Sequence, residues 1–123
     1  MQLYLETGSG TYSIDAYAHG EVTVRDTIYT RSLILTPETL VTDWPPNSIQ
    51  ELSAVHFEQV LALEPEIILL GTGQRLCFPE VSITANIMEK MIGLEVMDTA
   101  AACRTYNVLM TEGRKVAAAL LID

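Results

Sequence analysis

The chain has 123 residues, of which 49% are hydrophobic and 19% are charged, and its formal net charge is -9. This length fits one domain that buries about two-thirds of the surface exposed by its unfolded chain. An acidic chain repels phosphate backbones and anionic lipid headgroups, so the charge argues against a nucleic-acid partner and against direct membrane docking.

The beginning of the sequence has neither the cationic start nor the long apolar stretch of a signal peptide. The longest apolar run, residues 116–122, is far shorter than the roughly 18 residues that a membrane-spanning helix needs. Cys77 and Cys103 are interpreted as free thiols in a reducing compartment rather than as a disulfide. These features predict a cytoplasmic protein without membrane insertion.

The first part of the chain has the pattern of an antiparallel β-meander. Residues 1–10 contain Gly8-Ser9-Gly10 and are predicted to form a flexible N-terminus, with a single α/β domain over 11–123. Alternating and β-branched residues predict strands in the domain's first segment. The strands are expected over 13–18, 22–24 and 27–36, with turns at His19-Gly20 and Arg25-Asp26 between them.

The next segment is a stiff, extended connection at Trp44-Pro45-Pro46, followed by helix-start signals. Ser48-Ile49-Gln50-Glu51 matches a capping box, and Ser53 is a second candidate N-cap. We expect a helix over 53–63 that ends before Pro65. Its buried face is expected to carry Phe57, Val60 and Leu61.

The second half alternates strands with helices. The continuous apolar run at 66–70 is typical of a strand covered on both faces, and therefore of a parallel or mixed central sheet. A helix is predicted over 79–92, with Ile83, Ile87 and Met91 facing the core and Gly93 ending it. A second short strand is expected over 94–97.

The last helix begins at Asp98 or Thr99, because either side chain can accept hydrogen bonds from the first-turn amides. Its core face is expected to carry Ala102, Tyr106 and Leu109. Gly113 ends the helix, and residues 115–122 are favoured as a final strand. A meander followed by alternating helices and strands predicts an α/β fold.

Two signals at strand ends indicate where a ligand could bind. In open α/β sheets ligands bind at the carboxyl ends of strands, where glycines admit a ligand to the backbone and a helix N-terminus favours anions. The candidate ligand-binding crevice comprises Gly71, Thr72, Gly73, Arg75, Asp98, Thr99, Cys103, Arg104 and Asn107. The alternative is an ordinary tight turn, because the third glycine of a dinucleotide fingerprint and a Walker lysine are both missing.

Cys103 lies near the start of the predicted helix, where the helix dipole could lower its pKa and make it a nucleophile or a redox sensor. A Cys–His pair would need His19 or His56, which the sequence does not place nearby, so a small buried hydrophobe is favoured. The histidines and cysteines lack metal-ligand spacing and the acids are dispersed. The sequence therefore predicts no metal, no cofactor and no catalytic residues.

The motif of the last helix resembles a known family. It is carried by Gly71-Thr72-Gly73, then Met97-Asp98-Thr99 and Ala101-Ala102-Cys103-Arg104-Thr105-Tyr106-Asn107, then Glu112-Gly113-Arg114. These residues resemble the small domain of unknown function shared with mitochondrial complex I assembly factor 3 and the adipogenesis-associated single-domain protein. The resemblance runs from about Thr11 to the C-terminus, and the start without a presequence is typical of bacterial members.

The resemblance implies a three-layer α/β fold with a mixed central sheet and an N-terminal antiparallel β-meander layer. It implies no established enzyme activity and no agreed catalytic residues. The expected function is that of a non-enzymatic binding or accessory protein, which could assist assembly of a respiratory membrane complex by contacting its subunits. The alternative is a small-molecule or anion-binding protein, or an enzyme of unknown reaction, that uses the candidate crevice.

Overall fold

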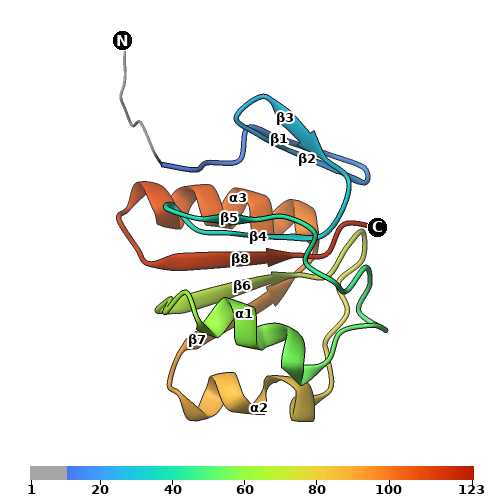
Figure 1. Ribbon diagram of the computed structural model, residues 1–123, viewed down its shortest axis with the longest axis vertical. Coiled ribbons are helices and arrows are strands. Elements are labelled where there is room, and N and C mark those ends of the chain that lie inside the picture. Colours follow the sequence, from blue (N-terminus) through green and yellow to red (C-terminus); the bar gives the residue numbers. More distant parts are fainter. Residues whose placement is uncertain (1–10) are drawn as a thin grey trace.

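A mixed five-stranded sheet lies at the centre of the computed structural model, which describes residues 11–123 (Figure 1). The predicted flexible N-terminus, residues 1–10, lies outside the described part of the chain. The elements follow the order β1 (Ala16–Ala18), β2 (Glu21–Val24), β3 (Thr27–Tyr29), β4 (Leu33–Leu35), β5 (Leu40–Val41), η1 (Ala54–His56), α1 (Phe57–Leu61), β6 (Ile67–Gly71), α2 (Val81–Glu89), β7 (Gly93–Met97), α3 (Thr99–Thr111) and β8 (Val116–Leu120).

The strand order of the central sheet, β5-β4-β8-β6-β7, explains why its helices lie on both faces. Strand β6 pairs in parallel with β7 on one side and with β8 on the other. The chain therefore moves from β6 to β7 and then back across β6 to β8. Because parallel crossovers are right-handed, these opposite movements place α2 and α3 on opposite faces of the sheet. Figure 1 shows α3 above the sheet and α1 and α2 below it.

Alternation along β8 divides the core into two parts. Val116, Ala118 and Leu120 belong to the cluster under α3, whereas Ala117 and Ala119 belong to the cluster under α1 and α2. All five residues of the strand are buried. A strand covered on both faces requires this continuous apolar sequence. The prediction of a final strand and of a mixed central sheet is confirmed.

The meander forms the extra β layer, in the antiparallel order β1-β2-β3. Arg25 and Asp26 have φ values of 49° and 66° and form the two-residue turn between β2 and β3, as predicted. The single strand predicted over 27–36 is wrong. It is two strands in different sheets: β3 ends at Tyr29, and β4 joins the central sheet beside β8.

The first helix begins at Ser53 and not at Ser48. The Glu51 carboxylate accepts a hydrogen bond from the Asn47 amide (3.0 Å), in a turn that does not continue as a helix. At Ser53 the reciprocal partner is His56, whose Nδ1 accepts from the Ser53 amide (3.0 Å). The helix is shorter than predicted because it consists of η1 and the five residues of α1.

Helix α2 is also shorter than predicted, and Met91 is not a core residue. The amide of Met91 donates to Met88 and that of Ile92 to Ile87, which is the Schellman pattern of a helix end. Met91 occupies the left-handed position of this motif, with φ of 60°, and its side chain is 92% exposed. Gly93 is the first residue of β7 instead of the helix-ending glycine.

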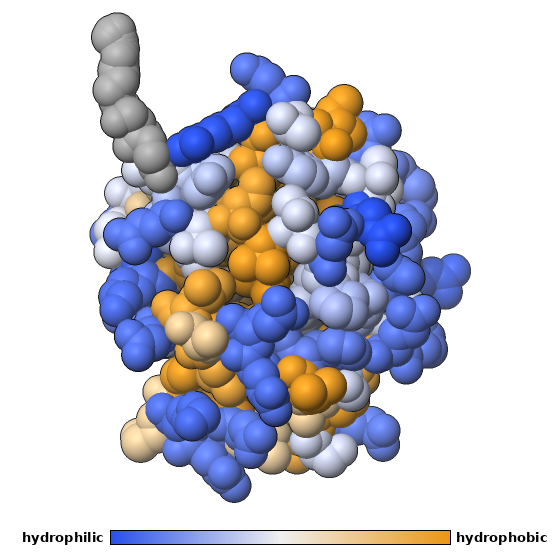
Figure 2. All heavy atoms as spheres, viewed as in Figure 1, coloured by the Kyte–Doolittle hydropathy of each residue, from blue (hydrophilic) through white to orange (hydrophobic). Residues whose placement is uncertain are grey.

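Figure 2 shows apolar side chains reaching the surface along the middle of the molecule as well as at its lower end, where α2 lies, among polar ones. The long helix α3 lies between the central sheet and the meander, and its predicted core residues Ala102 and Tyr106 are fully buried.

Candidate functional site

The loop after β6 and the start of α3 meet at the carboxyl ends of the parallel strands. The Thr72 amide donates to the Met97 carbonyl (2.9 Å), and the Gly73 amide donates to the Thr99 hydroxyl (2.8 Å). The Thr99 amide donates in return to the Gly73 carbonyl (2.9 Å). The structure therefore brings these predicted site residues together, but their polar groups bond to one another.

Buried Thr99, at the start of α3, hydrogen-bonds to both the loop after β6 and the segment after β8. Its side chain has no exposed surface, and its hydroxyl donates to the Leu121 carbonyl at 2.7 Å. A Cβ atom on Gly71 would lie 2.9 Å from this hydroxyl oxygen and 3.0 Å from the Thr99 Cα. Gly71 is therefore required by the close packing of α3 on β6, a structural reason that involves no ligand.

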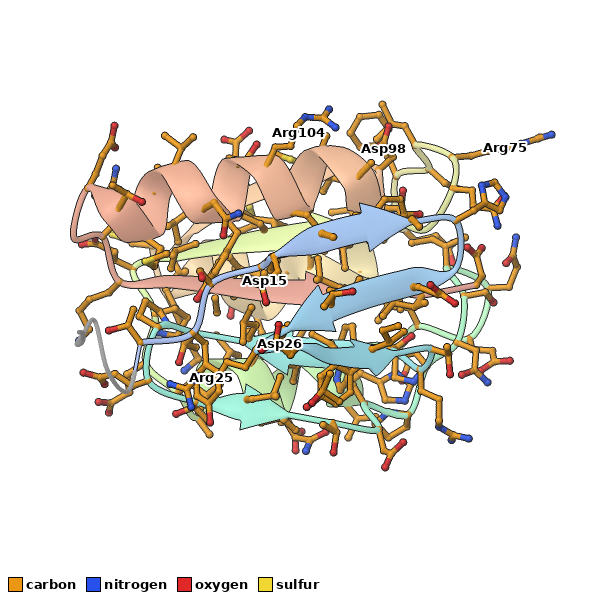
Figure 3. The ribbon with its side chains drawn as sticks, turned by 90° about the horizontal axis from the view of Figure 1, so that it is seen from above. Asp15, Arg25, Asp26, Arg75, Asp98 and Arg104 are labelled. Atoms are coloured by element: carbon orange, nitrogen blue, oxygen red, sulfur yellow. The ribbon has the colours of Figure 1, made fainter. Side chains whose placement is uncertain are left out.

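The rest of the loop is closed by its own contacts. Thr72 is buried, and its hydroxyl donates to the Arg75 carbonyl and accepts from the Cys77 amide. Gly73 has a φ of 102°, and a Cβ atom there would lie 2.7 Å from the Asp123 carboxylate. Arg75 is exposed, and Figure 3 shows its side chain extending away from the loop.

Asp98 occupies the helix N-terminus at which the sequence predicted an anion could bind. Its carboxylate accepts a hydrogen bond from the Ala101 amide (2.8 Å), which makes it the N-cap of α3. A carboxylate at this position already provides the negative charge that the helix dipole favours. The predicted cap is confirmed, and it satisfies the Ala101 amide, while the Thr99 amide bonds to the Gly73 carbonyl.

Three further predicted residues line a cleft between β1 and α3, about one turn along the helix. Cys103, Arg104 and Asn107 form its α3 side, opposite Asp15 and Tyr17 of the meander. The cleft has a volume of about 390 Å³. In Figure 3 the Arg104 side chain lies on the outer side of α3, away from Asp15. Of the nine predicted residues, five therefore lie in the closed junction and three line this cleft, whereas the Arg75 side chain extends away from both.

Polar side chains of α3 hold the meander in place. The Asn107 side chain accepts from the Ile14 amide (2.9 Å) and donates to the Ile14 carbonyl (2.8 Å). The Tyr106 hydroxyl donates to the Tyr12 carbonyl at 2.7 Å. These bonds pair side chains on α3 with backbone more than 90 residues earlier, so both residues have a structural use.

The favoured interpretation of Cys103 as a small buried hydrophobe is supported, and the alternative of a pKa lowered by the helix dipole is not. Only 4% of this residue is exposed, and desolvation by burial raises the pKa of the thiol to about 12. The Arg104 guanidinium lowers the pKa, but by less than burial raises it. The thiolate is the reactive form of cysteine, so Cys103 is a poor nucleophile and a poor redox sensor. Cys77 is exposed, and both thiols are free.

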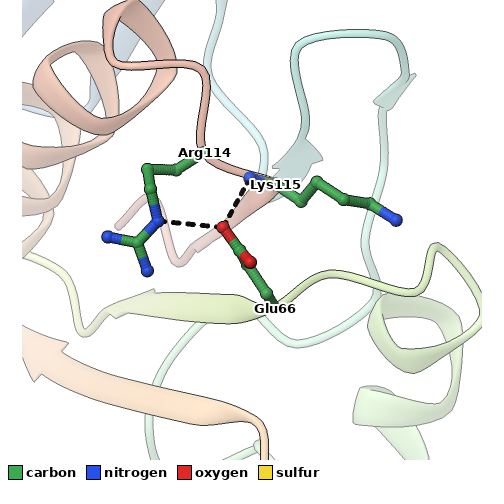
Figure 4. A network of polar contacts seen from close by, with 3 residues as sticks. All are labelled: Glu66, Arg114 and Lys115. Atoms are coloured by element: carbon green, nitrogen blue, oxygen red, sulfur yellow. Dashed lines mark hydrogen bonds and ion pairs between the residues drawn. The ribbon is translucent and has the colours of Figure 1, made fainter.

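A larger hollow, of about 470 Å³, lies where the parallel strands β6 and β8 begin, and it was not predicted from the sequence. Its lining includes Met110, Arg114, Lys115 and the Leu63–Pro65 turn. Beside it the Glu66 carboxylate accepts from Arg114 Nε (2.9 Å) and from the Lys115 amide (3.1 Å) (Figure 4).

A usable signal for this hollow existed in the sequence. Residues 64–66 precede β6 and residues 112–115 precede β8. Parallel strands start at the same edge of a sheet, so these two charged segments had to meet.

The described fold and junction define a three-layer α/β domain with an extra β-meander layer, whose strand-end loops are closed by internal hydrogen bonds. The family model described as "Protein of unknown function (DUF498/DUF598)" matches residues 14–121. The chain belongs to this family, and the predicted family resemblance is confirmed.

The proteins with similar sequences include NADH dehydrogenase assembly factors of animals and bacterial proteins. NADH dehydrogenase [ubiquinone] 1 alpha subcomplex assembly factor 3 from Mus musculus is 33% identical over 88% of this chain and 59% of its own length. The "13 kDa major membrane protein" of Francisella tularensis is 35% identical over 61% of each chain. This chain thus spans about six-tenths of the length of these curated relatives.

A solved structure has the same fold. The NMR structure of a Xanthomonas campestris protein is 46% identical, has a TM-score of 0.83, and is matched over 91% of this chain and 85% of that one. Within residues 11–123, no helix is both long and apolar enough to cross a bilayer. In the same residues, no group of three or more His, Cys, Asp or Glu side chains is placed to hold a metal ion.

Proposed function

We propose that this protein is a non-enzymatic accessory that binds other proteins and assists the assembly of a respiratory membrane complex from the cytoplasmic side. The similarity to complex I assembly factor 3, which extends over 88% of the chain, carries this proposal. The matched region includes the central sheet, its helices and the meander. The partners would be subunits of that complex.

The internal chemistry of the domain supports a binding role over a catalytic one. The Gly73 amide bonds to the Thr99 hydroxyl, the Asp98 carboxylate bonds to the Ala101 amide, and burial favours the neutral thiol of Cys103. An active site would present at least one activated nucleophile, acid or base to a substrate. The polar residues of α3 instead fix the position of the meander.

The test is to express a tagged form near its native level, solubilise membranes gently and identify the co-purifying proteins by mass spectrometry. We expect enrichment of respiratory complex I subunits, together with lower levels of assembled complex after gene deletion. Normal complex levels in the deletion strain, with no enrichment of its subunits, would contradict the proposal.

A second candidate function is binding of a small anionic molecule in the cleft between β1 and α3. The observation that favours it is a hollow of about 390 Å³ whose lining includes the cationic residue Arg104. A metabolite that binds there should raise the melting temperature of the wild-type protein but not that of Arg104→Ala. A broad metabolite screen without any such shift would remove this candidate.

A further inference from the structure

Helix α2 and the loop before it hold an unusual concentration of exposed apolar side chains. Within residues 11–123, five of the eight large hydrophobic residues that are exposed lie between positions 76 and 91. They are Leu76 (53% exposed), Phe78 (70%), Val81 (80%), Met88 (64%) and Met91 (92%). We call these five residues the α2 apolar surface. Scattered exposed hydrophobics are normal, but a concentration of this kind marks an interaction site.

The apolar residues of α2 occupy two sides of the helix. Ile83 and Ile87 pack into the core cluster with Trp44 and Phe57. Val81 and Met88 are seven residues apart, which is two turns, so they lie on one outward line. The outward side of a surface helix is usually polar, so an apolar line there indicates contact with another molecule.

Met91 is held in a conformation that disfavours its side chain. Its φ of 60° is the left-handed region, where the helix-ending position of a Schellman motif usually carries glycine. The side chain makes no compensating packing, because 92% of it is exposed. Folding stability therefore does not account for methionine at this position. Backbone strain of this kind, retained without a local benefit, points to a functional requirement for the side chain.

The charge around the surface limits what can cover it. On the face of the sheet that α1 and α2 cover, exposed Glu58 lies on α1, and exposed Glu80 and Glu89 lie at the two ends of α2. The one cation at this helix is Lys90. A second copy would bring two such acidic layers together, and an anionic membrane would meet the same repulsion.

We infer that the α2 apolar surface is a docking site for an amphipathic helical segment of another protein that carries Lys or Arg beside its apolar face. The outward line of α2 offers a helix-length ridge, and the two methionines are flexible side chains that adapt to a partner's shape. The surrounding glutamates match the basic flanks. This inference rests on the proposed function, because it names the surface and the kind of segment through which an accessory protein would hold its partners.

The test uses a synthetic amphipathic helix of leucine and lysine, about five turns long, titrated into the isotopically labelled full chain. Amide resonances are followed by NMR. We expect shifts concentrated in residues 76–91, with affinity that weakens as salt is added. Two matched peptides are the controls: a scrambled sequence of the same composition, and a leucine–glutamate helix of the same periodicity.

Two variants separate binding from folding. Met91→Gly relieves the left-handed strain, so its melting temperature should be unchanged or raised by about 2 to 5 °C. The same variant should bind the leucine–lysine helix at least about tenfold more weakly. Phe78→Ser should weaken binding similarly with little change in melting temperature. As a matched control, Val108→Ser removes an exposed apolar residue from α3 and should leave binding unchanged.

Several outcomes would overturn the inference. These are shifts outside residues 76–91, equal binding of either control peptide, or full binding by Met91→Gly and Phe78→Ser. Concentration-dependent self-association of the wild type that both variants abolish would instead assign the surface to a second copy. If complex I subunits co-purify equally with wild type and both variants, the docking site is wrong while the proposed function stands.

Discussion

The two faces of the central sheet use their helices in opposite ways. On one face α3 lies beneath the meander and turns polar groups inward, where Asn107 and Tyr106 bond to backbone of the preceding layer. On the other face, no layer formed by residues 11–123 covers α2, and the helix turns large apolar side chains outward. Polar residues in the covered helix therefore hold the fold together, whereas apolar residues in the uncovered helix are available to a partner.

The largest expected loss of stability comes from a substitution on the buried side of α2. Ile87→Ala removes a fully buried side chain from the core under this helix and should cost about 2 to 5 kcal/mol of unfolding free energy. Met88→Ala, at the neighbouring exposed position, should change it by less than about 0.5 kcal/mol. Denaturant unfolding followed by circular dichroism measures both. Equal losses would mean that the two sides of α2 are equivalent and that the comparison is wrong.

On the α3 face, the next effect comes from Gly71→Ala. The added methyl group would lie 2.9 Å from the Thr99 hydroxyl oxygen, so the helix must move away from β6, at a cost of about 1 to 3 kcal/mol. Gly113→Ala is the matched control. It also replaces a glycine near α3, but among residues 11–123 no heavy atom beyond its chain neighbours lies within 4 Å of the new methyl, so only the φ of 80° opposes it. That cost should be near 1 kcal/mol.

Asn107→Ala should loosen the meander more than the central sheet. It leaves the amide and carbonyl of Ile14 without partners, at a cost of about 1 to 2 kcal/mol because water can reach part of this region. Hydrogen exchange should accelerate in β1 to β3 and stay unchanged in β6 and β8. Uniform acceleration across both sheets would show that the meander and the central sheet unfold as one unit.

The smallest effect is expected at the boundary between the faces, where Glu66 joins the start of β6 to the loop before β8. The hydrogen bond from Arg114, followed by that from the Lys115 amide, lowers the pKa of Glu66 in the folded state. Its contribution to stability is therefore present above the unfolded pKa and is lost as pH falls through the lower folded pKa. Glu66→Gln should reduce the acid-side loss of stability, measured by unfolding at pH 7 and pH 3. An unchanged pH dependence in this variant would exclude the contribution.

Sequence reasoning succeeded where a local pattern, such as a cap or an apolar periodicity, is enough to determine the element. The cap at Asp98, the core face of α3 and the buried strand β6 each follow from periodicity and capping chemistry, and the structure has them all. It failed where tertiary context decides. Residues 27–36 contain no glycine or proline, so no local turn signal marks the point where the chain leaves one sheet for the other.

The candidate site was also predicted in part: its location followed from the topology, but its hydrogen bonding did not. The topology rule correctly placed the glycine loop beside the start of α3, because both follow parallel neighbouring strands. It did not reveal that Thr99 and the backbone of Leu121 would satisfy the polar groups there. The outward Met91 escaped notice because a methionine at helical spacing usually belongs to the core, and only the actual helix end turns it to the surface.

The position of β8 has a consequence for how the protein is made. This strand follows every other strand in the chain, yet it lies in the middle of the sheet, between β4 and β6. Until residues 116–120 have been synthesised, the sheet consists of two separate strand pairs, β5-β4 and β6-β7, with unpaired inner edges. We therefore expect folding on the ribosome to wait for β8 and to be slow, because its pairing with β4 closes a loop of most of the domain. A nascent chain that pauses before β8 would depend on chaperones to protect those edges from aggregation.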